Sequence, residues 1–400
     1  MIPETLTDQF RRRLHYTKTD FTRGLMREIN WDDRLIGLKG ARGVGKTTLL
    51  LQYIKLELND KLEQTLYVSL DHFWFAENRL FDLAEDFSLQ GGKFLFVDEV
   101  HKYPDWSLEL KLIYDTFPGL KVVFTGSSLL EILNARADLS RRAVVYTMQG
   151  LSFREYLEIK TGQSFDVQTL DYILSDENNL SSTVLEVTSP VGHFKQYLKK
   201  GYYPFFLEGE ISYLSKINEV ANLILEIELP LLRKVDSAYI PRIKQLLYIL
   251  AESVPFKPNV TKLSERIGIK RNTLVNYLHY LEEVKLTINL HRDSLGISKL
   301  QKPLKIYLEN PNLMYAIKSE QIDIGTLRET FFLNQTAYQH QVTYPEKGDF
   351  YIQNHGLFEV GGKNKTRKQL QGTENGYLAL DDIEFKNGNK IPLWHFGFLY

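Results

Sequence analysis

The sequence predicts an α/β protein whose N-terminal part is a parallel, doubly wound sheet, and two observations support this. Residues 40–47 read GARGVGKT, which fits the phosphate-binding pattern G-x-x-x-x-G-K-[ST] without a mismatch. Short apolar runs alternate with helical segments through the first 150 residues. These predicted strands cover residues 34–39, 65–70, 93–98, 120–125 and 143–148. Such a sheet binds its ligand at the carboxyl ends of its strands.

The phosphate-binding loop lies between the first predicted strand and a predicted helix at residues 47–58. Its glycines let the backbone wrap around phosphate oxygens, and the helix N-terminus adds a partial positive charge. Lys46 adds a full charge, and Thr47 would offer its hydroxyl to Mg²⁺. The alternative is a glycine-rich turn with an exposed lysine. The residues expected to bind the nucleotide are Gly40, Ala41, Arg42, Gly43, Val44, Gly45, Lys46, Thr47 and Thr48.

An apolar strand that ends in two acidic residues follows the loop. The run at residues 93–98 ends in Asp98, and Glu99 comes next, which is a Walker B pattern. Asp98 would face hydrated Mg²⁺, and Glu99 would polarise the attacking water. After the fourth predicted strand, Ser127 or Ser128 would stand beside the γ-phosphate, with a helix N-cap as the equally weighted alternative.

Composition excludes several classes of protein. The chain of 400 residues is long enough for two to four domains, and its net charge of −1 argues neither for nor against a polyanionic partner. Cysteine is absent, which excludes disulfides and thiolate metal sites. No apolar run approaches the ~18 residues of a membrane span. We expect a cytoplasmic protein that does not associate with membranes.

Residues 1–33 read as amphipathic helix, with Phe10, Leu14 and Leu25 packing inward.

Three motifs resemble the prokaryotic AAA-like ATPases that carry an uncharacterised C-terminal half. They are FVDEVHKYPDW at residues 96–106, FTGSS at 124–128, and Arg142 leading into LSFREYL at 151–157. The resemblance extends over nearly the whole chain and is specific in the first 157 residues. It implies a sheet of the additional-strand class, with the strand at 120–125 beside the phosphate-loop strand. It also implies Asp98 on the Mg²⁺ side and Glu99 as catalytic base, with Ser127 or Ser128 as sensor.

The same resemblance implies a homo-oligomer in which one subunit completes the active site of its neighbour. Arginine commonly does this by stabilising charge on the transferring phosphoryl group. Arg141 and Arg142 precede the fifth predicted strand and are the candidates, with ordinary surface arginines as the alternative.

The chain is expected to divide at residues 150, 235 and 308. The helical pattern of residues 151–235 predicts a lid, in which aromatic residues such as Phe194 and Tyr197 form a core. Residues 236–308 predict a winged helix-turn-helix, with its second motif helix starting at residue 271. Acidic Glu282 and Glu283 come later in that helix and the domain is not strongly basic, so an internal or protein-contacting module is an equal alternative. The candidate DNA contacts are Lys262, Arg266, Lys270, Arg271, Asn272, Thr273 and Asn276.

Residues 309–400 predict a small α+β module similar in layout to the PD-(D/E)xK nuclease superfamily. The matching carboxylates are Glu329, Asp349 and Glu359. Glycine occupies the expected lysine position at 361, and Lys363 is the proposed substitute. We therefore expect weak or absent metal-dependent DNA cleavage. The basic run at residues 363–368 is interpreted as solvated surface rather than a nucleic-acid contact. Residues 382–386 and 390–398 are expected to form two paired strands.

Together these patterns predict Mg²⁺-dependent ATP binding and hydrolysis coupled to a DNA-associated task. One alternative is a signalling or defence switch in which ATP or ADP gates a protein partner. Another is an ATP-regulated DNA nuclease.

Overall fold

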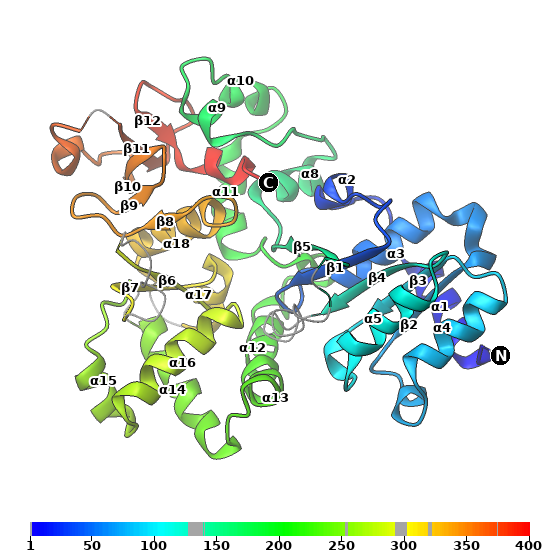
Figure 1. Cartoon of the computed structure of the whole chain (residues 1–400). Helices are drawn as coiled ribbons and strands as arrows, with labels where there is room; N and C mark the ends of the chain where they lie inside the picture. Colours follow the sequence, from blue (N-terminus) through cyan, green and yellow to red (C-terminus); the bar gives the residue numbers. More distant parts are fainter. Residues whose placement is uncertain are drawn as a thin grey trace. The chain divides into compact units, whose positions relative to one another are not determined.

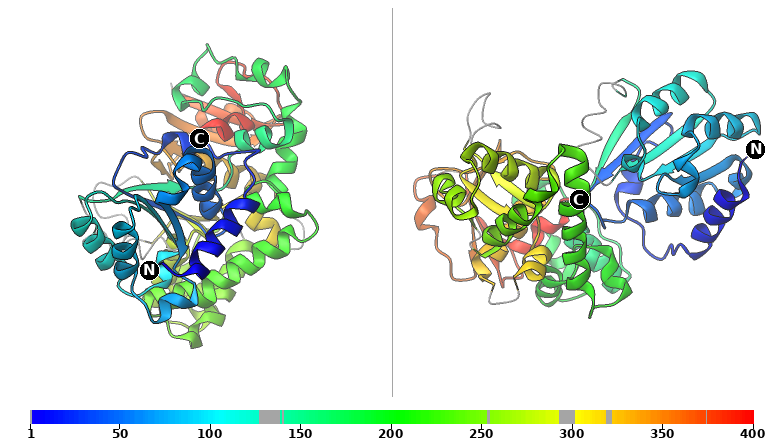
Figure 2. Two further views of the ribbon diagram at one scale, coloured as in Figure 1. Left: turned by 90° about the vertical axis from the view of Figure 1, so that its right-hand side faces the viewer. Right: turned by 90° about the horizontal axis from the view of Figure 1, so that it is seen from below.

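The computed structural model describes residues 2–126, 139, 141–252, 255–292, 302–318, 322–373 and 375–400. The chain divides into two compact units, Met1–Gly150 and Leu151–Tyr400. Each is described by itself (Figures 1 and 2). The boundaries expected at residues 235 and 308 stay predictions. Every helix in the described part of the chain is too short or too polar to cross a bilayer.

The first unit is built on a parallel sheet of five strands in the order β2-β3-β4-β1-β5. This confirms the predicted α/β class and the position of β4 beside β1. Each strand lies within one residue of its predicted bounds, because buried apolar runs mark parallel strands well. The strands are β1 (Leu35–Gly40), β2 (Thr65–Ser69), β3 (Phe94–Asp98), β4 (Lys121–Gly126) and β5 (Val144–Met148).

Helices cover both faces of this sheet (Figure 1). One core lies between the strands and α4 and α5, and the other lies between the strands and α2 and α3. Phe10, Leu14 and Leu25 are buried in the second core, as expected. The helices and 3₁₀ segments are α1 (Glu4–Tyr16), α2 (Leu25–Glu28), α3 (Lys46–Glu57), η1 (Asn59–Gln64), η2 (Phe73–Ala76), α4 (Leu80–Leu89), η3 (Val100–Lys102) and α5 (Trp106–Thr116).

The second unit begins with a helical region that confirms the predicted secondary structure. Phe194, Tyr197 and Tyr202 are each buried in its core. Its elements are α8 (Phe153–Thr161), α9 (Leu170–Leu174), α10 (Leu180–Leu185), α11 (Pro190–Lys199), η4 (Pro204–Glu208), α12 (Tyr213–Leu223), η5 (Ile224–Glu228), α13 (Leu229–Arg233) and η6 (Ser237–Tyr239).

Three helices and a two-stranded antiparallel sheet come next. Leu274, Leu278 and Leu281 are buried along one face of α16, as their helical spacing predicts. Phe256 forms an antiparallel bridge with Ile306 beside the sheet. The elements are α14 (Ile240–Glu252), α15 (Val260–Ile267), α16 (Arg271–Glu283), β6 (Thr287–Leu290) and β7 (Lys305–Leu308).

The C-terminal part holds two helices and a mixed sheet in the order β12-β11-β10-β9-β8. Strand β10 pairs antiparallel with β9 and parallel with β11, which the sequence analysis did not assign. The elements are α17 (Pro311–Ile317), α18 (Ile324–Thr336), β8 (Val342–Thr343), β9 (Phe350–Ile352), β10 (Gly356–Gly362), η8 (Arg367–Leu370), β11 (Gly376–Asp381), β12 (Lys390–Pro392) and η9 (Leu393–Phe398).

The pairing expected between residues 382–386 and 390–398 is wrong. Strand β12 pairs with β11 in parallel, and η9 follows it directly. Every residue of η9 is buried, whereas a half-exposed strand would bury alternate side chains. The 3₁₀ turn places Trp394 and Phe398 against Phe153 of α8. The two ends of the second unit therefore share one core.

Candidate active site

The loop between β1 and α3 needs glycine at three positions. Gly43 and Gly45 have φ of +83° and +100°, which side chains with a Cβ rarely adopt. A Cβ on Gly40 would lie 2.3 Å from the Met148 carbonyl oxygen on β5. Packing at Gly40 and backbone geometry at Gly43 and Gly45 therefore favour glycine, and Gly40 and Gly45 are the two glycines of the predicted pattern.

A buried arginine holds this loop against the end of β5. Arg23 is 6% exposed and donates from Nη1 to the Val44 carbonyl oxygen at 2.9 Å. Its Nη2 donates to the carbonyl oxygens of Gln149 and Gly150, each at 2.9 Å. The sequence analysis missed Arg23, because no local pattern marks a residue that acts at separations of 21 and 126 positions.

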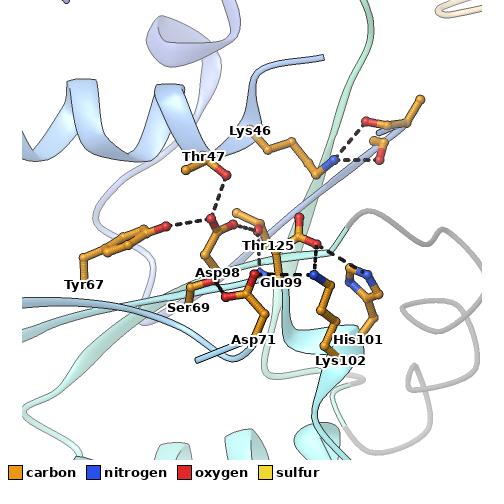
Figure 3. Close-up of polar contacts among 12 residues, drawn as sticks. Lys46, Thr47, Tyr67, Ser69, Asp71, Asp98, Glu99, His101, Lys102 and Thr125 are labelled. Carbon is orange, nitrogen blue, oxygen red and sulfur yellow. Dashed lines mark hydrogen bonds and ion pairs between the residues drawn. The ribbon is translucent and has the colours of Figure 1, made fainter. Parts of the chain in front are cut away.

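Lys46 opens α3, and its ammonium group lies inside the curve of the loop. Its Nζ donates to the carbonyl oxygens of Gly40 and Ala41, each at 2.9 Å (Figure 3). The side chain is buried, so its charge is only weakly screened by solvent. This arrangement places a full positive charge beside the phosphate-binding loop.

The Asp98 carboxylate at the end of β3 is held by three hydroxyl groups (Figure 3). Thr47 donates to its Oδ2 at 2.6 Å, and Tyr67 donates to the same oxygen at 2.7 Å. Thr125, on β4, donates to Oδ1. Asp98 is 1% exposed, yet none of these donors carries a charge. The hydroxyl groups therefore satisfy the carboxylate without neutralising it, and the oxygen-rich pair of Thr47 and Asp98 suits a hard cation.

Tyr67 connects this carboxylate to the N-terminal helix. Arg13 on α1 donates to the Tyr67 hydroxyl at 2.7 Å. Burial and the nearby Asp98 charge raise the pKa of Tyr67. Its hydroxyl therefore stays protonated and donates to Asp98. Neither Tyr67 nor Thr125 was singled out from sequence, although each lies near the carboxyl end of a strand that pairs with β3.

Glu99 follows Asp98 with a strained backbone, since its φ is +56°. Its amide donates to Thr125 Oγ1 at 3.2 Å. One carboxylate oxygen lies 3.5 Å from His101 Nε2 and 3.9 Å from Lys102 Nζ (Figure 3). Burial, followed by the charge of Asp98, raises the pKa of Glu99, whereas Lys46, Lys102 and Arg42 lower it. A raised pKa suits a group that accepts a proton near neutral pH.

Lys102 lies between two carboxylates. Besides Glu99, its Nζ lies 3.4 Å from Asp71 Oδ2. Asp71 accepts a hydrogen bond from Ser69 at the end of β2, at 2.6 Å. Lys102 therefore links the carboxyl end of β2 to Glu99, a connection that the sequence analysis did not identify.

The remaining candidates in the first unit are two serines and two arginines. Ser127 and Ser128 lie outside the described residues. Arg142 pairs with Asp115 of α5 through Nε and Nη2, at 2.9 and 3.0 Å. Arg141 is exposed, with φ of +70°. The role of either arginine at a neighbouring subunit stays a prediction.

A second group of acidic residues lies in the C-terminal part. Glu329 of α18 accepts a hydrogen bond from the Tyr307 hydroxyl at 2.6 Å. Lys365 Nζ lies 3.4 Å from Asp349 Oδ2 and 3.2 Å from Glu359 Oε1. Burial, followed by the charge of Asp349, raises the pKa of Glu329. The structure thus brings the three predicted carboxylates into one neighbourhood.

The lysine that joins this group is Lys365, whereas the sequence analysis expected Lys363. A Cβ on Gly361 would lie 2.4 Å from Lys365 Cδ, so the glycine leaves room for that side chain to cross the strand. Lys363 is exposed. Glu359 is 1% exposed, and its Oε2 has no hydrogen-bond partner. Among the described residues, no group of three or more His, Cys, Asp or Glu side chains is arranged to hold a metal ion.

The candidate DNA contacts lie on the exposed side of α15 and α16. Thr273 is half-buried, whereas the others are exposed, which leaves their polar atoms accessible. The exposed residues are Lys262, Arg266, Lys270, Arg271, Asn272 and Asn276.

Comparisons with known proteins give two domain matches. Residues 32–157 match an AAA domain, and residues 191–322 match a domain of unknown function, DUF8612. The chain is 30% identical over 404 residues to an uncharacterized protein of Methanocaldococcus jannaschii, MJ1637, spanning 91% of this chain and 84% of that protein.

Solved structures give more distant likenesses. The Walker-type ATPase paby2304 of Pyrococcus abyssi is 13% identical with a TM-score of 0.44, covering 74% of this chain and 95% of that one. AMPPCP-bound DnaA from Aquifex aeolicus is 13% identical with a TM-score of 0.28, covering 71% of this chain and 90% of that one.

Proposed function

The chain belongs to the same family as the M. jannaschii protein MJ1637 and carries an AAA domain, and on this basis we propose that it binds ATP with Mg²⁺, hydrolyses it and couples hydrolysis to a task on DNA. One observation carries the ATPase part of the proposal. Lys46, Thr47, Asp98 and Glu99 come from two separate motifs and converge at the carboxyl ends of β1 and β3 (Figure 3).

The loop residues bind the triphosphate. Amide groups of residues 40–47 surround the phosphates, and the Lys46 ammonium turns from the loop carbonyls toward the β- and γ-phosphates. Thr47 and Asp98 would hold Mg²⁺, which when bound would neutralise charge on the phosphate oxygens. Tyr67 and Thr125 orient the Asp98 carboxylate and leave its negative charge intact.

Glu99 acts as the base in this proposal. It accepts a proton from the water that attacks the γ-phosphate, which requires the ionised carboxylate. Lys46, Lys102 and Arg42 counteract the effect of burial on its pKa. His101 and Lys102 both lie beside one oxygen of this carboxylate, Oε2.

The DNA part of the proposal depends on α14–α16 with β6 and β7, which we interpret as a winged helix-turn-helix. The exposed first turn of α16, including Lys270 and Arg271, would enter a major groove, and Lys262 and Arg266 would contact phosphates. The competing interpretation is a nucleotide-gated switch in which this surface binds a protein.

Measuring ATP hydrolysis with and without single- and double-stranded DNA tests these alternatives. We expect hydrolysis that requires Mg²⁺ and that DNA accelerates. Slow turnover with tight retention of nucleotide, unchanged by DNA, would instead support the switch. Absence of both ATP binding and hydrolysis would overturn the proposal.

An ATP-regulated DNA nuclease is the second candidate, and the position of Lys365 beside Asp349 and Glu359 favours it. Both carboxylates are already paired with that lysine, so we expect slow cleavage at most. Nicking of supercoiled plasmid with Mn²⁺ tests this. Cleavage that disappears in both Asp349→Asn and Lys365→Gln would support the nuclease, and cleavage that survives both would trace it to a contaminant.

A further inference from the structure

The turns around β10, β11 and β12 enclose a cavity that the proposed ATPase does not use. Its volume is about 510 Å³, and its wall comes from residues 363–367, from β11 and from residues 387–390. The basic run that the sequence analysis interpreted as solvated surface forms one side of this cavity. The tertiary structure therefore gives these residues a concave setting that the sequence did not indicate.

Among the residues that the structure describes, four cations and no carboxylates line the cavity. The cations are Lys363, Lys365, Arg367 and Lys390. Lys365 is neutralised by Asp349 and Glu359, which holds in place the turn that also carries Lys363.

Lys363 and Lys390 differ from Lys365 in their surroundings. Among the described residues, neither Lys363 nor Lys390 has an ion-pair partner within 4.0 Å. Lys363 contributes to the lowered pKa of Asp382, but Lys195 is the main cause and lies 2.7 Å from that carboxylate. The cavity therefore carries a net positive charge that favours an anion.

A second cavity of about 470 Å³ shares Arg367 with the first. It is formed by residues 367–373, and Arg367 Nη2 donates to the Thr373 carbonyl oxygen at 3.0 Å. Arg367 therefore lines both cavities, and this hydrogen bond restricts its guanidinium group. Adjoining cavities with an arginine between them suit a ligand that carries several phosphates in series better than a single anion.

Amide side chains give the first cavity a second kind of contact. Asn364, Asn387 and Asn389 line it beside the cations, and Asn389 Nδ2 donates to the Gly376 carbonyl oxygen at 2.9 Å. Amides donate and accept hydrogen bonds, so they can pair with the edges of unstacked bases. Bases inside a duplex could not enter such a cavity.

We propose that these adjoining cavities bind a single strand of nucleic acid, with Lys363, Arg367 and Lys390 contacting its phosphates. Binding of this kind does not depend on ATP hydrolysis or on the α16 surface. It follows from the cavity, its charge and its amide groups together.

Binding of fluorescein-labelled dT12 to the full chain, followed by anisotropy without ATP, tests the proposal. The variant combines Lys363→Gln, Arg367→Gln and Lys390→Gln. The matched control combines Lys199→Gln, Lys200→Gln and Lys216→Gln, which removes the same charge from α11, α12 and the residue after α11. Loss of three phosphate contacts should reduce the slope of log affinity against log salt concentration by ~2. It should also weaken dT12 binding by about 100-fold at 0.1 M salt. The control should bind as the wild type does.

Three outcomes would overturn the proposal. The first is an equal loss of dT12 affinity in the variant and the control, which would show that only the total charge of the protein matters. The second is unchanged dT12 binding in the variant, with melting curves that match the wild type. The third is binding of dTMP as tight as that of dT12, which indicates a small phosphorylated ligand. Duplex binding that depends on Lys270 and Arg271 would test the α16 surface separately, so the two proposals can fail independently.

Discussion

Asp98 and Glu359 are both buried carboxylates on sheet strands, but their partners differ in charge. Thr47, Tyr67 and Thr125 donate hydroxyl groups to Asp98, so both of its oxygens are satisfied and its charge is retained. Glu359 instead lies 3.2 Å from the Lys365 ammonium at Oε1, and its Oε2 has no partner.

This difference predicts what each group can bind. A carboxylate oriented by neutral donors remains available to an incoming cation, whereas one paired with an ammonium group is already neutralised. The Asp98 group is therefore suited to Mg²⁺. The Glu359 group must lose or move Lys365 before a metal ion can bind.

Replacing the base should have the largest effect. Glu99→Gln keeps the size of the side chain but cannot accept a proton, so we expect hydrolysis to fall by about 10²–10⁴-fold while ATP binding persists. Because the pKa of Glu99 is raised, wild-type activity should decline with falling pH earlier than for an ordinary glutamate. Steady-state rates across pH 5–8 measure both effects. Near-normal turnover by the variant would assign the base elsewhere.

Removing the lysine of the phosphate loop should weaken ATP binding about 100-fold. Lys46→Ala deletes a charged donor worth ~3 kcal/mol at most. Calorimetric titration measures the change, and Lys61→Ala, an exposed lysine in η1, serves as control. If Lys46→Ala bound ATP as tightly as the wild type, the loop would not be the phosphate site.

Removing one hydroxyl donor from Asp98 tests how that carboxylate is held. Tyr67→Phe should raise the Mg²⁺ concentration needed for half-maximal hydrolysis by about tenfold, since a hydrogen bond to a charged group contributes roughly 1.5 kcal/mol. Tyr53→Phe is the control, because Tyr53 is also aromatic and stacks on Trp31 in the same unit. Equal Mg²⁺ dependence in both variants would show that Tyr67 has only a packing role.

Removing the ammonium group tests the second carboxylate group. Lys365→Gln should cost about 1 kcal/mol, or ~2–4 °C in melting temperature, because the pair is partly exposed. The freed carboxylates should then bind Mn²⁺. Thermal melts with and without Mn²⁺ should show stabilisation in the variant and little in the wild type. If Mn²⁺ stabilised the wild type and the variant equally, Lys365 would not be what keeps a metal ion from these carboxylates.

Glu309 is a third buried carboxylate. Among the described residues, its Oε2 has neither a hydroxyl nor an ammonium group as a hydrogen-bond partner. Burial raises its pKa to about 7 from 4.5 in an unfolded chain. The folded state therefore holds this proton more tightly, and stability declines as the pH rises from 4.5 to about 7. Glu309→Gln should flatten that decline and stabilise the chain by about 1 kcal/mol at pH 8. If the melting temperatures of the wild type and Glu309→Gln changed equally with pH, this prediction would be wrong.

Features that depend on neighbouring residues could be predicted from the sequence. The glycines before Lys46 and the pair of Asp98 and Glu99 act through the local backbone, so their order in the chain was sufficient to predict them. The strands of the first sheet were found because each is a continuous apolar run between helices. In the C-terminal part, β11 was missed and η9 was taken for a strand, because short apolar runs do not distinguish these conformations.

The distant side chains that complete each site could be identified only once the chain was seen folded. Tyr67 reaches Asp98 across 31 positions, and Arg23 reaches Gly150 across 127. Lys365 replaced Lys363 beside Glu359 because Gly361 leaves space for its side chain. These contacts depend on strand order and on packing between segments far apart in the chain. No pattern of local residues contains that information.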